Sequence, residues 1–435
     1  MTQIDFPDQP PSEVSLWSVL ALRDFRLFMA GRFIGALATQ IQSVAVGWQV
    51  YEITKSPISL GFVGLAQFLP MVLLLLPAGD IADRFDRRLI AAASYIAQAT
   101  SVAILAFLTW TGVADHSIWP FYLALALFGA GRAFSSPATR AFVPLLVSSA
   151  QLPRAIAVSS SAFISATIIG PALGGFIYIL GPLAAYGVCF SFFVIVAIAF
   201  IAIRTRHEQQ PVDPTLSAFG RLTAGIAYIR GKPIVLGAIS LDLFAVLLGG
   251  AVALLPIYAS DILHVGPQGL GLLRSGPALG AVVINALLIA MPVQRYTGYV
   301  MFACVGLFGV ATIVFGLSEN FYLSMGMLII MGGADMVSVY VRSTLIPLAT
   351  PLNMLGRVSA VDMMFVSASN ELGEFESGLM AGWLGTVPSV VVGGLGTIGI
   401  VGLWMWLFPA LRKVDRLMDV KPDDEPGLIK SGLIK

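Results

Sequence analysis

Long apolar runs recur along the chain, and short polar, proline-containing or glycine-containing breaks separate them. A helix that crosses a bilayer needs about 20 mainly apolar residues. Division of the chain at the breaks predicts twelve such helices, at residues 26–50, 57–79, 89–111, 119–142, 155–180, 183–203, 234–260, 267–292, 299–317, 321–346, 358–382 and 388–409. The pattern therefore predicts an all-α membrane protein with twelve transmembrane helices.

The amino-acid composition strengthens this prediction. Of the 435 residues, 57% are hydrophobic and only 11% are charged, whereas soluble domains carry about 25% charged residues. The segment before Leu16 is polar and contains prolines, so we expect no cleavable signal peptide. Both cysteines, Cys189 and Cys304, fall inside predicted helices, so we predict neither a disulfide framework nor a metal site.

Positively charged residues predict the orientation in the membrane, because cytoplasmic loops carry an excess of lysine and arginine. With a cytoplasmic N-terminus, the outer loops together hold a single basic residue, Lys55. The cytoplasmic segments then hold most of the others, among them Arg295, Arg342 and Arg357 in loops of the second half of the chain. We therefore expect both termini in the cytoplasm.

The polar segment 204–233 divides the predicted helices into two sets of six. An offset of 210 residues places Pro57 and Gly61 on Pro267 and Gly271. An offset of 203 matches further identical residues, which in the first set are Gly129, Ser135, Pro144, Arg154, Ala157, Val158 and Gly175. Such a repeat is typical of transporters with a central site between the halves. We expect a cytoplasmic segment 1–24, a six-helix bundle 25–203, a cytoplasmic loop 204–233, a second bundle 234–409 and a cytoplasmic tail 410–435.

Three stretches of sequence resemble a known family. The arginine- and aspartate-rich segment 79–88 resembles motif A of the major facilitator superfamily, and it departs at Asp86, where the pattern usually has glycine. Its matching residues are Gly79, Asp83, Arg84, Arg87 and Arg88. The segment 170–175, with Gly170, Pro171, Gly174 and Gly175, resembles the end of motif C of antiporters. The strings at 137–144, 356–361 and 369–378 look like the bacterial enterobactin-exporter-like branch.

This resemblance implies the major facilitator fold and a role for motif A. Asp83 would contact the adjacent arginines and the positive N-terminus of the eleventh span near Gly356, and so latch the halves while the site faces outward. Alternatively, Asp83 only offsets the arginine charges. The glycines and proline of the motif C segment allow a helix bend and close helix contact, which generic packing would also explain.

Charged residues inside the predicted spans are candidates for the transport site, because a mid-membrane charge costs roughly 2.5–3.5 kcal/mol. The resemblance implies that spans one, four, seven and ten line a central cavity, and they contain Arg32, Arg132, Asp242 and Asp335. The repeat offsets pair Arg32 with Asp242 and Arg132 with Asp335, so the related positions carry opposite charge. Polar residues on the same helix faces add the substrate candidates Thr39, Ser43, Ser135 and Ser338. The four charges would alternatively form purely structural ion pairs.

The eleventh predicted span contributes two further carboxylates. Glu371 and Glu374 share one helix face, whereas Glu376 points away from them. Two neighbouring carboxylates in a buried place are suited to bind and release a proton. Glu371, Glu374, Asp242 and Asp335 are therefore the proton-coupling candidates. Arg274, two turns from the outer end of span eight, is interpreted as reaching the headgroups.

The sequence thus favours a secondary active transporter of the bacterial inner membrane. We expect proton-coupled efflux of an amphipathic small molecule, siderophore-like or drug-like, by alternating access; the alternative is uptake or flipping of a lipid-like or other small substrate. A membrane enzyme or receptor is disfavoured, because the chain has no nucleotide loop, metal-ligand helix or nucleophile elbow. We expect no cofactor besides the proton gradient, a monomer, and the substrate and the bilayer as partners, with no nucleic acid.

Overall fold

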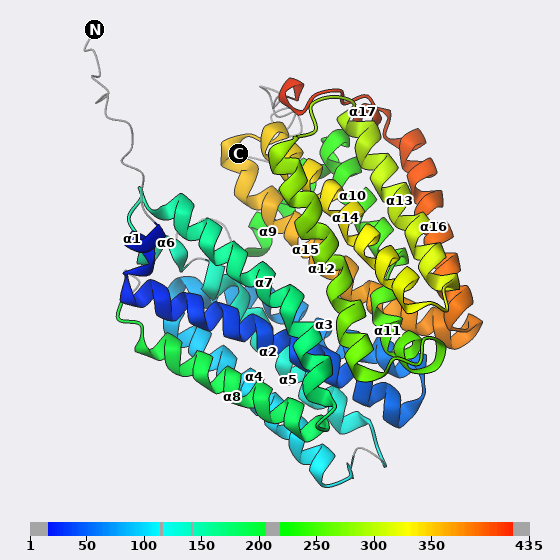
Figure 1. The fold of residues 1–435 in the computed structure, drawn as a ribbon. Helices are drawn as coiled ribbons and strands as arrows, with labels where there is room; N and C mark the ends of the chain where they lie inside the picture. Colours follow the sequence, from blue (N-terminus) through cyan, green and yellow to red (C-terminus); the bar gives the residue numbers. More distant parts are fainter. Residues whose placement is uncertain (1–15, 114–115, 141, 206–217, 421–435) are drawn as a thin grey trace.

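The computed structural model describes residues 16–113, 116–140, 142–205 and 218–420, and within these ranges the regular secondary structure is helical throughout (Figure 1). The first half contains α1 (Leu16–Leu20), α2 (Arg23–Thr54), α3 (Pro57–Arg84), α4 (Arg87–Trp110), α5 (Trp119–Arg140), α6 (Val143–Leu146), α7 (Leu152–Tyr178) and α8 (Pro182–Ala202). The second half contains α9 (Ala218–Arg230), α10 (Pro233–Leu248), η2 (Ala251–Leu254), α11 (Leu255–Ile257), η3 (Tyr258–Ile262), α12 (Gly266–Ala290), α13 (Thr297–Leu317), α14 (Phe321–Ala349), α15 (Leu352–Leu384), α16 (Thr386–Leu407), α17 (Pro409–Arg412) and η4 (Leu417–Asp419).

Each of the twelve predicted spans contains a helix at the expected place. Nine of the described helices or helix series are long and apolar enough to cross a membrane. The spans that fall outside these nine are α2, α5 and α15, and they carry Arg32, Arg132 and the glutamates of the eleventh span. The three less apolar spans are therefore also the ones that carry these site candidates.

Two predictions about helix boundaries are wrong. The segment 79–88 is not a loop along its whole length, because α3 continues to Arg84 and only Phe85 and Asp86 form the turn. The Asp86 side chain accepts a hydrogen bond from Arg88 N and so caps the start of α4. The aspartate that departs from the motif therefore provides the helix cap.

The seventh span is also not one continuous helix. Helix α10 ends at Leu248, and the chain continues through Gly249 and Gly250 into the 3₁₀ turn η2, the single turn α11 and the π-helical η3. A glycine pair followed by Pro256 weakens the regular hydrogen-bond ladder of an α-helix, which explains the interruption.

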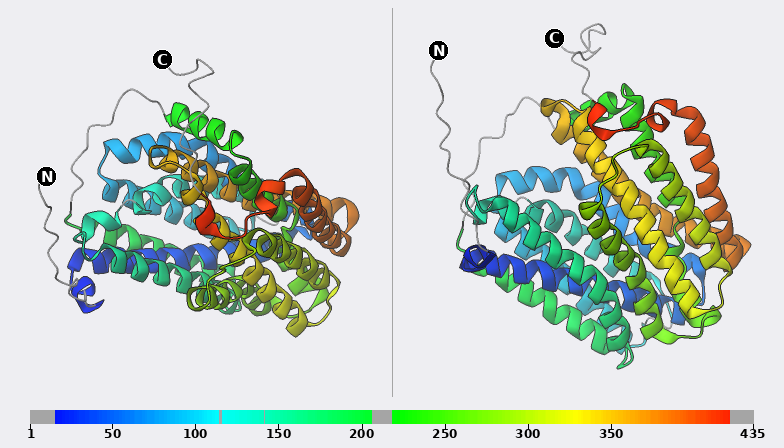
Figure 2. Two further views of the ribbon diagram at one scale, coloured as in Figure 1. Left: turned by 90° about the horizontal axis from the view of Figure 1, so that it is seen from above. Right: turned by 45° about the horizontal axis from the view of Figure 1, so that its top comes forward.

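The helices pack as two bundles that follow the two halves of the chain (Figures 1 and 2). In the first, α2 packs against α7 and α8, and α4 against α5 and α8. In the second, α14 packs against α12 and α13, and α10 against α15 and α16. We call the end of the molecule with Asp24, Asp86 and Thr205 the terminal end, and the opposite end, with Lys55 and Gly181, the distal end.

The two bundles meet through α3 with α15 and α7 with α12. At both interfaces glycines near the distal end permit very close approach: a methyl group added to Gly378 would lie 2.6 Å from the Gly61 Cα, and one added to Gly271 would lie 3.1 Å from the Gly175 Cα. Gly61 and Gly271 are related by the repeat, as are Gly175 and Gly378. The sequence repeat therefore produces two pseudo-symmetric contacts between the halves.

The hydrophobic core differs between the distal end and the terminal end of the molecule. One cluster of buried residues fills the first half and continues into the distal part of the second, from Ala251 to Ala259 and including Leu270 and Phe315. A separate cluster, with Val235, Ile239 and Leu345, fills the terminal part of the second half. The core is thus shared between the halves at the distal end and divided at the terminal end.

Candidate functional site

One ion pair of the described residues crosses directly between the two halves. Arg132 on α5 donates to Glu371 on α15, with Nη1 3.1 Å from Oε1. The Arg132 and Glu371 side chains are 34% and 16% exposed, so most of the surface of each is buried within the protein. A pair in such a place is stronger than one at a solvated surface. The interaction therefore joins the halves near the middle of both helices.

A second arginine lies beside the other glutamate of α15. Arg274 Nη2 lies 3.9 Å from Glu374 Oε1, and Arg274 Nη1 donates to the Ser43 carbonyl of α2 at 3.4 Å. The Arg274 side chain is only 15% exposed, so the interpretation that it reaches the headgroups is wrong. Glu374 packs against Gly64 of α3, where an added methyl group would lie 2.9 Å from Oε2. Arg132, Glu371, Arg274 and Glu374 together are called the inter-half cluster below.

Asp242 has a cation partner within its own half. Arg342 on α14 lies 3.3 Å from Asp242 on α10 and donates to Asp362 on α15 at 2.8 Å. Arg342 and Asp242 are almost completely buried, with side chains 6% exposed. Asp335 and Ser338, on α14, share a small pocket with Asp242. These residues form an intra-half cluster, and the assignment of Arg342 to a cytoplasmic loop is wrong.

The remaining cavity candidates of the first half are distributed over different surroundings. The Arg32 guanidinium lies over the Phe163 ring of α7, 5.3 Å from its centroid. Thr39 donates to the Gly35 carbonyl of its own helix. Ser135 faces α4, where it accepts from Gln98 at 3.5 Å. Ser135 therefore lies inside the first half rather than toward the second.

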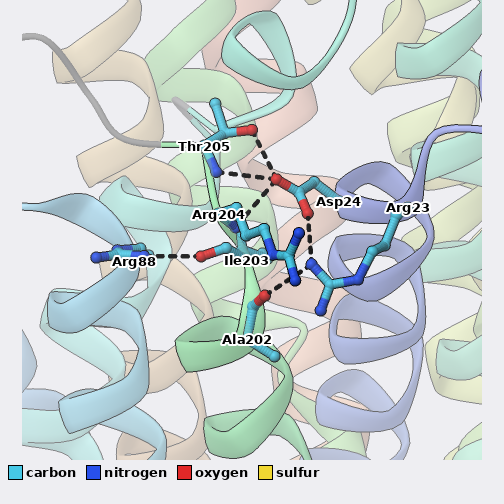
Figure 3. Close-up of polar contacts among 7 residues, drawn as sticks. All are labelled: Arg23, Asp24, Arg88, Ala202, Ile203, Arg204 and Thr205. Atoms are coloured by element: carbon cyan, nitrogen blue, oxygen red, sulfur yellow. Dashed lines mark hydrogen bonds and ion pairs between the residues drawn. The ribbon is translucent and has the colours of Figure 1, made fainter.

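Part of the predicted latch belongs to a junction of three helix ends (Figure 3). Arg88 of α4 donates to the Ile203 carbonyl at 2.8 Å and pairs with Asp86 at 2.7 Å. Asp24 of α2 accepts from Arg204 N, Thr205 N and Thr205 Oγ1 at 3.0, 2.9 and 2.8 Å. These contacts satisfy the backbone groups after α8 within the first half.

Partial burial opposes ionisation of Asp24, but the hydrogen bonds from Thr205 and Arg204 and the charge of Arg23 outweigh it and lower the pKa of Asp24 below its usual range. Arg87 is the first residue of α4. The side chains of the other latch residues, Gly79, Asp83 and Arg84, lie outside the described residues.

The residues of the motif C segment make close helix contacts. Gly170 and Gly174 pack on α2, where added methyl groups would lie 2.6 Å from Gln40 Cβ and 3.0 Å from Ile41 Cα. Gly175 packs on α12, and the Pro171 carbonyl lies against Gly271. Pro171 is inside α7, which continues from Leu152 to Tyr178. These residues therefore allow close helix packing, both within the first half and between the two halves.

Sequence reasoning missed Arg274, Arg342 and Asp362 as parts of the two clusters. One signal was available for Arg342: it follows Asp335 by seven residues and Ser338 by four, which places all three on one helix face. The partners of Arg274 lie on α2 and α15, which are distant in sequence, so no local pattern indicates them.

Comparisons with known proteins agree with this architecture. Residues 14–427 match the transmembrane secretion effector family. The enterobactin exporter EntS of Citrobacter koseri is 26% identical over 92% of this chain and 95% of its own, and the macrolide efflux protein A of Streptococcus pyogenes is 25% identical over 83% and 90%. The crystal structure of a bacterial homologue of the human lysosomal transporter Spinster, inward-facing and occupied, aligns with a TM-score of 0.68 at 14% identity, over 90% of this chain and 97% of its own. The chain belongs to the transmembrane secretion effector family of the major facilitator superfamily and is a multi-pass membrane transporter.

Proposed function

We propose that the protein is a proton-coupled exporter that moves an amphipathic small molecule out of the cytoplasm by alternating access. The observation that carries the proposal is the inter-half cluster, in which Arg132 and Glu371 pair across the two halves at 3.1 Å and Arg274 and Glu374 lie beside them. An ion pair between halves must break or rearrange when the halves rock. Its protonation state and the conformation are therefore thermodynamically linked.

The proposed coupling step is proton transfer to Glu371 or Glu374. Protonation of Glu371 removes its negative charge, which weakens its attraction to Arg132 of the other half and lowers the free energy needed to separate the halves. Protonation of Glu374 weakens its attraction to Arg274 within the second half, and these two side chains in turn contact Gly64 and Ser43 of the first half. Deprotonation on the other side of the membrane restores the attraction. The aspartates of the intra-half cluster, Asp242 and Asp335, are the second candidates for the proton carrier.

The direction and the substrate class rest on the relatives. An enterobactin exporter and a macrolide efflux protein both match more than four fifths of the chain. We infer a siderophore-like or drug-like substrate and export from the cytoplasm, with the predicted orientation of cytoplasmic termini in the bacterial inner membrane. Multidrug resistance by antiport is the corresponding physiological proposal. Uptake or flipping of a lipid-like molecule is the alternative, since the same fold supports it.

Transport by the purified protein in liposomes tests the proposal. A panel of labelled siderophores, macrolides and lipids would be measured with and without an imposed pH gradient. We expect concentrative movement of one class only with the gradient. Glu371→Gln or Glu374→Gln should abolish that movement and leave exchange of labelled for unlabelled substrate, whereas Glu319→Gln, at an exposed loop position, should change neither.

Three outcomes would contradict parts of this assignment. Gradient-driven accumulation at the wild-type rate in both glutamate variants would transfer the proton role to Asp242 or Asp335. Accumulation without any pH gradient would exclude proton coupling. Selective movement of the lipid alone would favour the alternative function.

A further inference from the structure

The break in the seventh span borders a small polar pocket away from both charged clusters. Residues from α10, η2, α13, α15 and α16 line it, and the polar ones are Thr312, Glu376, Ser377 and Ser389. The pocket has room for about one water-sized sphere at most. It is therefore too small for an organic substrate and suits a single dehydrated ion.

The glycine pair fixes the break against α15 at this pocket. A methyl group added to Gly250 would lie 2.7 Å from both the Gly373 carbonyl oxygen and Ser377 Oγ. Ala251 N donates to the Gly249 carbonyl at 2.7 Å, which replaces the regular helical bond. The carbonyls of the last turn of α10 lie against neighbouring helices, Val246 and Leu247 against Gly373 of α15 and Leu248 against Gly393 of α16. Unwound backbone of this kind coordinates coupling ions in other secondary transporters.

The hydroxyl groups of the pocket present oxygen lone pairs rather than hydrogens. Thr312 Oγ1 donates to the Phe308 carbonyl and Ser389 Oγ to the Thr386 carbonyl, each at 2.8 Å. Ser377 Oγ donates to a Glu376 carboxylate oxygen at 3.5 Å. Because each hydroxyl hydrogen is already committed, the remaining lone pairs are acceptors only. Such a lining disfavours an anion and favours a cation.

Glu376 supplies the negative charge. Among the described residues it has no arginine, lysine or histidine within ion-pair distance, in contrast to Glu371 and Glu374. Its carboxylate instead accepts a long hydrogen bond, of 3.5 Å, from the Ser377 hydroxyl. A partly buried carboxylate without a cation partner is costly inside a membrane protein. A bound cation would remove this cost.

We propose that this pocket is a sodium site, formed by the Glu376 carboxylate and the hydroxyl oxygens of Thr312, Ser377 and Ser389 beside the break of the seventh span. A single carboxylate among neutral oxygens matches a monovalent ion, whereas calcium sites usually gather several carboxylates. The ion would join α13, α15 and α16 next to the end of α10. The site is separate from the proposed proton carriers, and its existence does not rest on the proposed function.

Binding of ²²Na⁺ to the purified protein in detergent tests this proposal without any transport measurement. We expect saturable binding that unlabelled sodium chloride displaces and choline chloride at the same ionic strength does not. Sodium should also raise the melting temperature by about 2 °C at a concentration ten times the dissociation constant. Glu376→Gln should weaken binding at least tenfold, and Ser389→Ala, a smaller change, several-fold.

The matched control is Glu319→Gln, a carboxylate at an exposed loop position; it should bind sodium like the wild type. Equal displacement by choline, or unchanged affinity in Glu376→Gln and Ser389→Ala, would overturn the site. If Glu376→Gln does not fold, Ser389→Ala decides the question alone. The proposal would also be overturned if no sodium binds and the melting temperature depends on pH in the wild type but not in Glu376→Gln. That result would mean that a proton, rather than sodium, neutralises Glu376.

Discussion

At the scale of single residues, the partner of a buried charge decides what the charge can do. Arg132 and Arg342 are both arginines inside helices, but Arg132 bridges the two halves and Arg342 joins two aspartates of one half. The Arg132 pair must change when the halves separate, whereas the Arg342 contacts can persist through a rigid-body motion. The first arrangement suits coupling and the second suits stability of the bundle.

A double-mutant cycle tests the Arg132–Glu371 pair. Arg132→Ala, Glu371→Ala and the double variant would be compared by thermal unfolding in detergent. Because the atoms lie 3.1 Å apart, we expect a coupling free energy of about 0.5–3 kcal/mol. Additive effects of the two single changes would show that the residues do not interact in the dominant state. The same cycle with Arg132 and Glu319, an exposed loop residue, should give no coupling.

Removal of Arg342 should be more severe. Arg342→Ala leaves Asp242 and Asp362 close together without their cation, and a broken buried pair costs about 3–5 kcal/mol. We expect a large fall in the melting temperature, partly recovered when Asp242→Asn removes one of the negative charges. Arg295→Ala is the control, since its pair with Asp415 is 60% and 41% exposed and should contribute at most about 1 kcal/mol.

The opposite charges predicted from the repeat show what a sequence can and cannot indicate at this scale. Intramembrane charges were recognisable because they interrupt apolar runs, and all four candidates lie in helices of the structure. Their partners were not recognisable, because the packing of helices far apart in sequence selects them. Asp242 contacts Arg342, one hundred residues away, and Arg132 contacts Glu371 rather than an aspartate.

At the scale of helices, the apolar run lengths were sufficient to locate the spans, since a bilayer demands about 20 apolar residues and full internal hydrogen bonding. The exceptions are local. The α10 break depends on Gly249 and Gly250 packing against α13 and α15, and hydropathy alone does not distinguish it from a continuous helix. The extension of α3 to Arg84 was not predicted, because a cluster of charged residues between two apolar runs is compatible with a loop as well as with the polar end of a helix.

The Asp24 junction predicts a pH dependence of stability. The folded-state pKa of Asp24 is lowered, so its contribution is present above the unfolded pKa of about 3.9 and is lost as the pH falls through the folded pKa. Asp24→Asn should lower stability at pH 7 by about 2 kcal/mol, since hydrogen bonds to a charged acceptor are removed. The difference from wild type should shrink below about pH 4 in unfolding measurements. A difference that is independent of pH would mean that the amide replaces the carboxylate fully or that Asp24 acts only by packing.

The close glycine contact between α3 and α15 predicts a conformational effect. Gly378→Val would place side-chain atoms into α3, where even a methyl group would lie 2.6 Å from the Gly61 Cα. The distal ends of the halves should therefore separate, and a spin label on each half near that end should report longer distances. Gly306→Val on α13 is the matched control, because no atom lies within 4 Å of its added methyl group. Unchanged distances in Gly378→Val would mean that the contact relaxes locally.

At the scale of the whole molecule, the core is shared between the halves at the distal end and divided at the terminal end, which under the proposed alternating-access mechanism corresponds to one of its two states. If the termini are cytoplasmic as expected, the halves share a core on the outer side of the membrane and have separate cores on the cytoplasmic side. The motif A latch would then operate in the other state, where the terminal ends approach. We therefore predict that the motif A residues and the glycine contacts stabilise opposite states of one two-state equilibrium.

This opposition can be tested with two substitutions at opposite ends of the molecule. Asp83→Asn should weaken the outward-facing state and shift the population toward the state described here, with reduced transport and near-normal substrate binding. Gly378→Val should shift the population the other way. If each change amounts to about 1.4 kcal/mol, each shifts the ratio of states about tenfold, and the double variant should return close to the wild-type distribution of distances between spin labels at the terminal ends. Two shifts in the same direction, or a double variant that follows Gly378→Val alone, would contradict a single equilibrium, because a rigid rocking motion cannot open one end without closing the other.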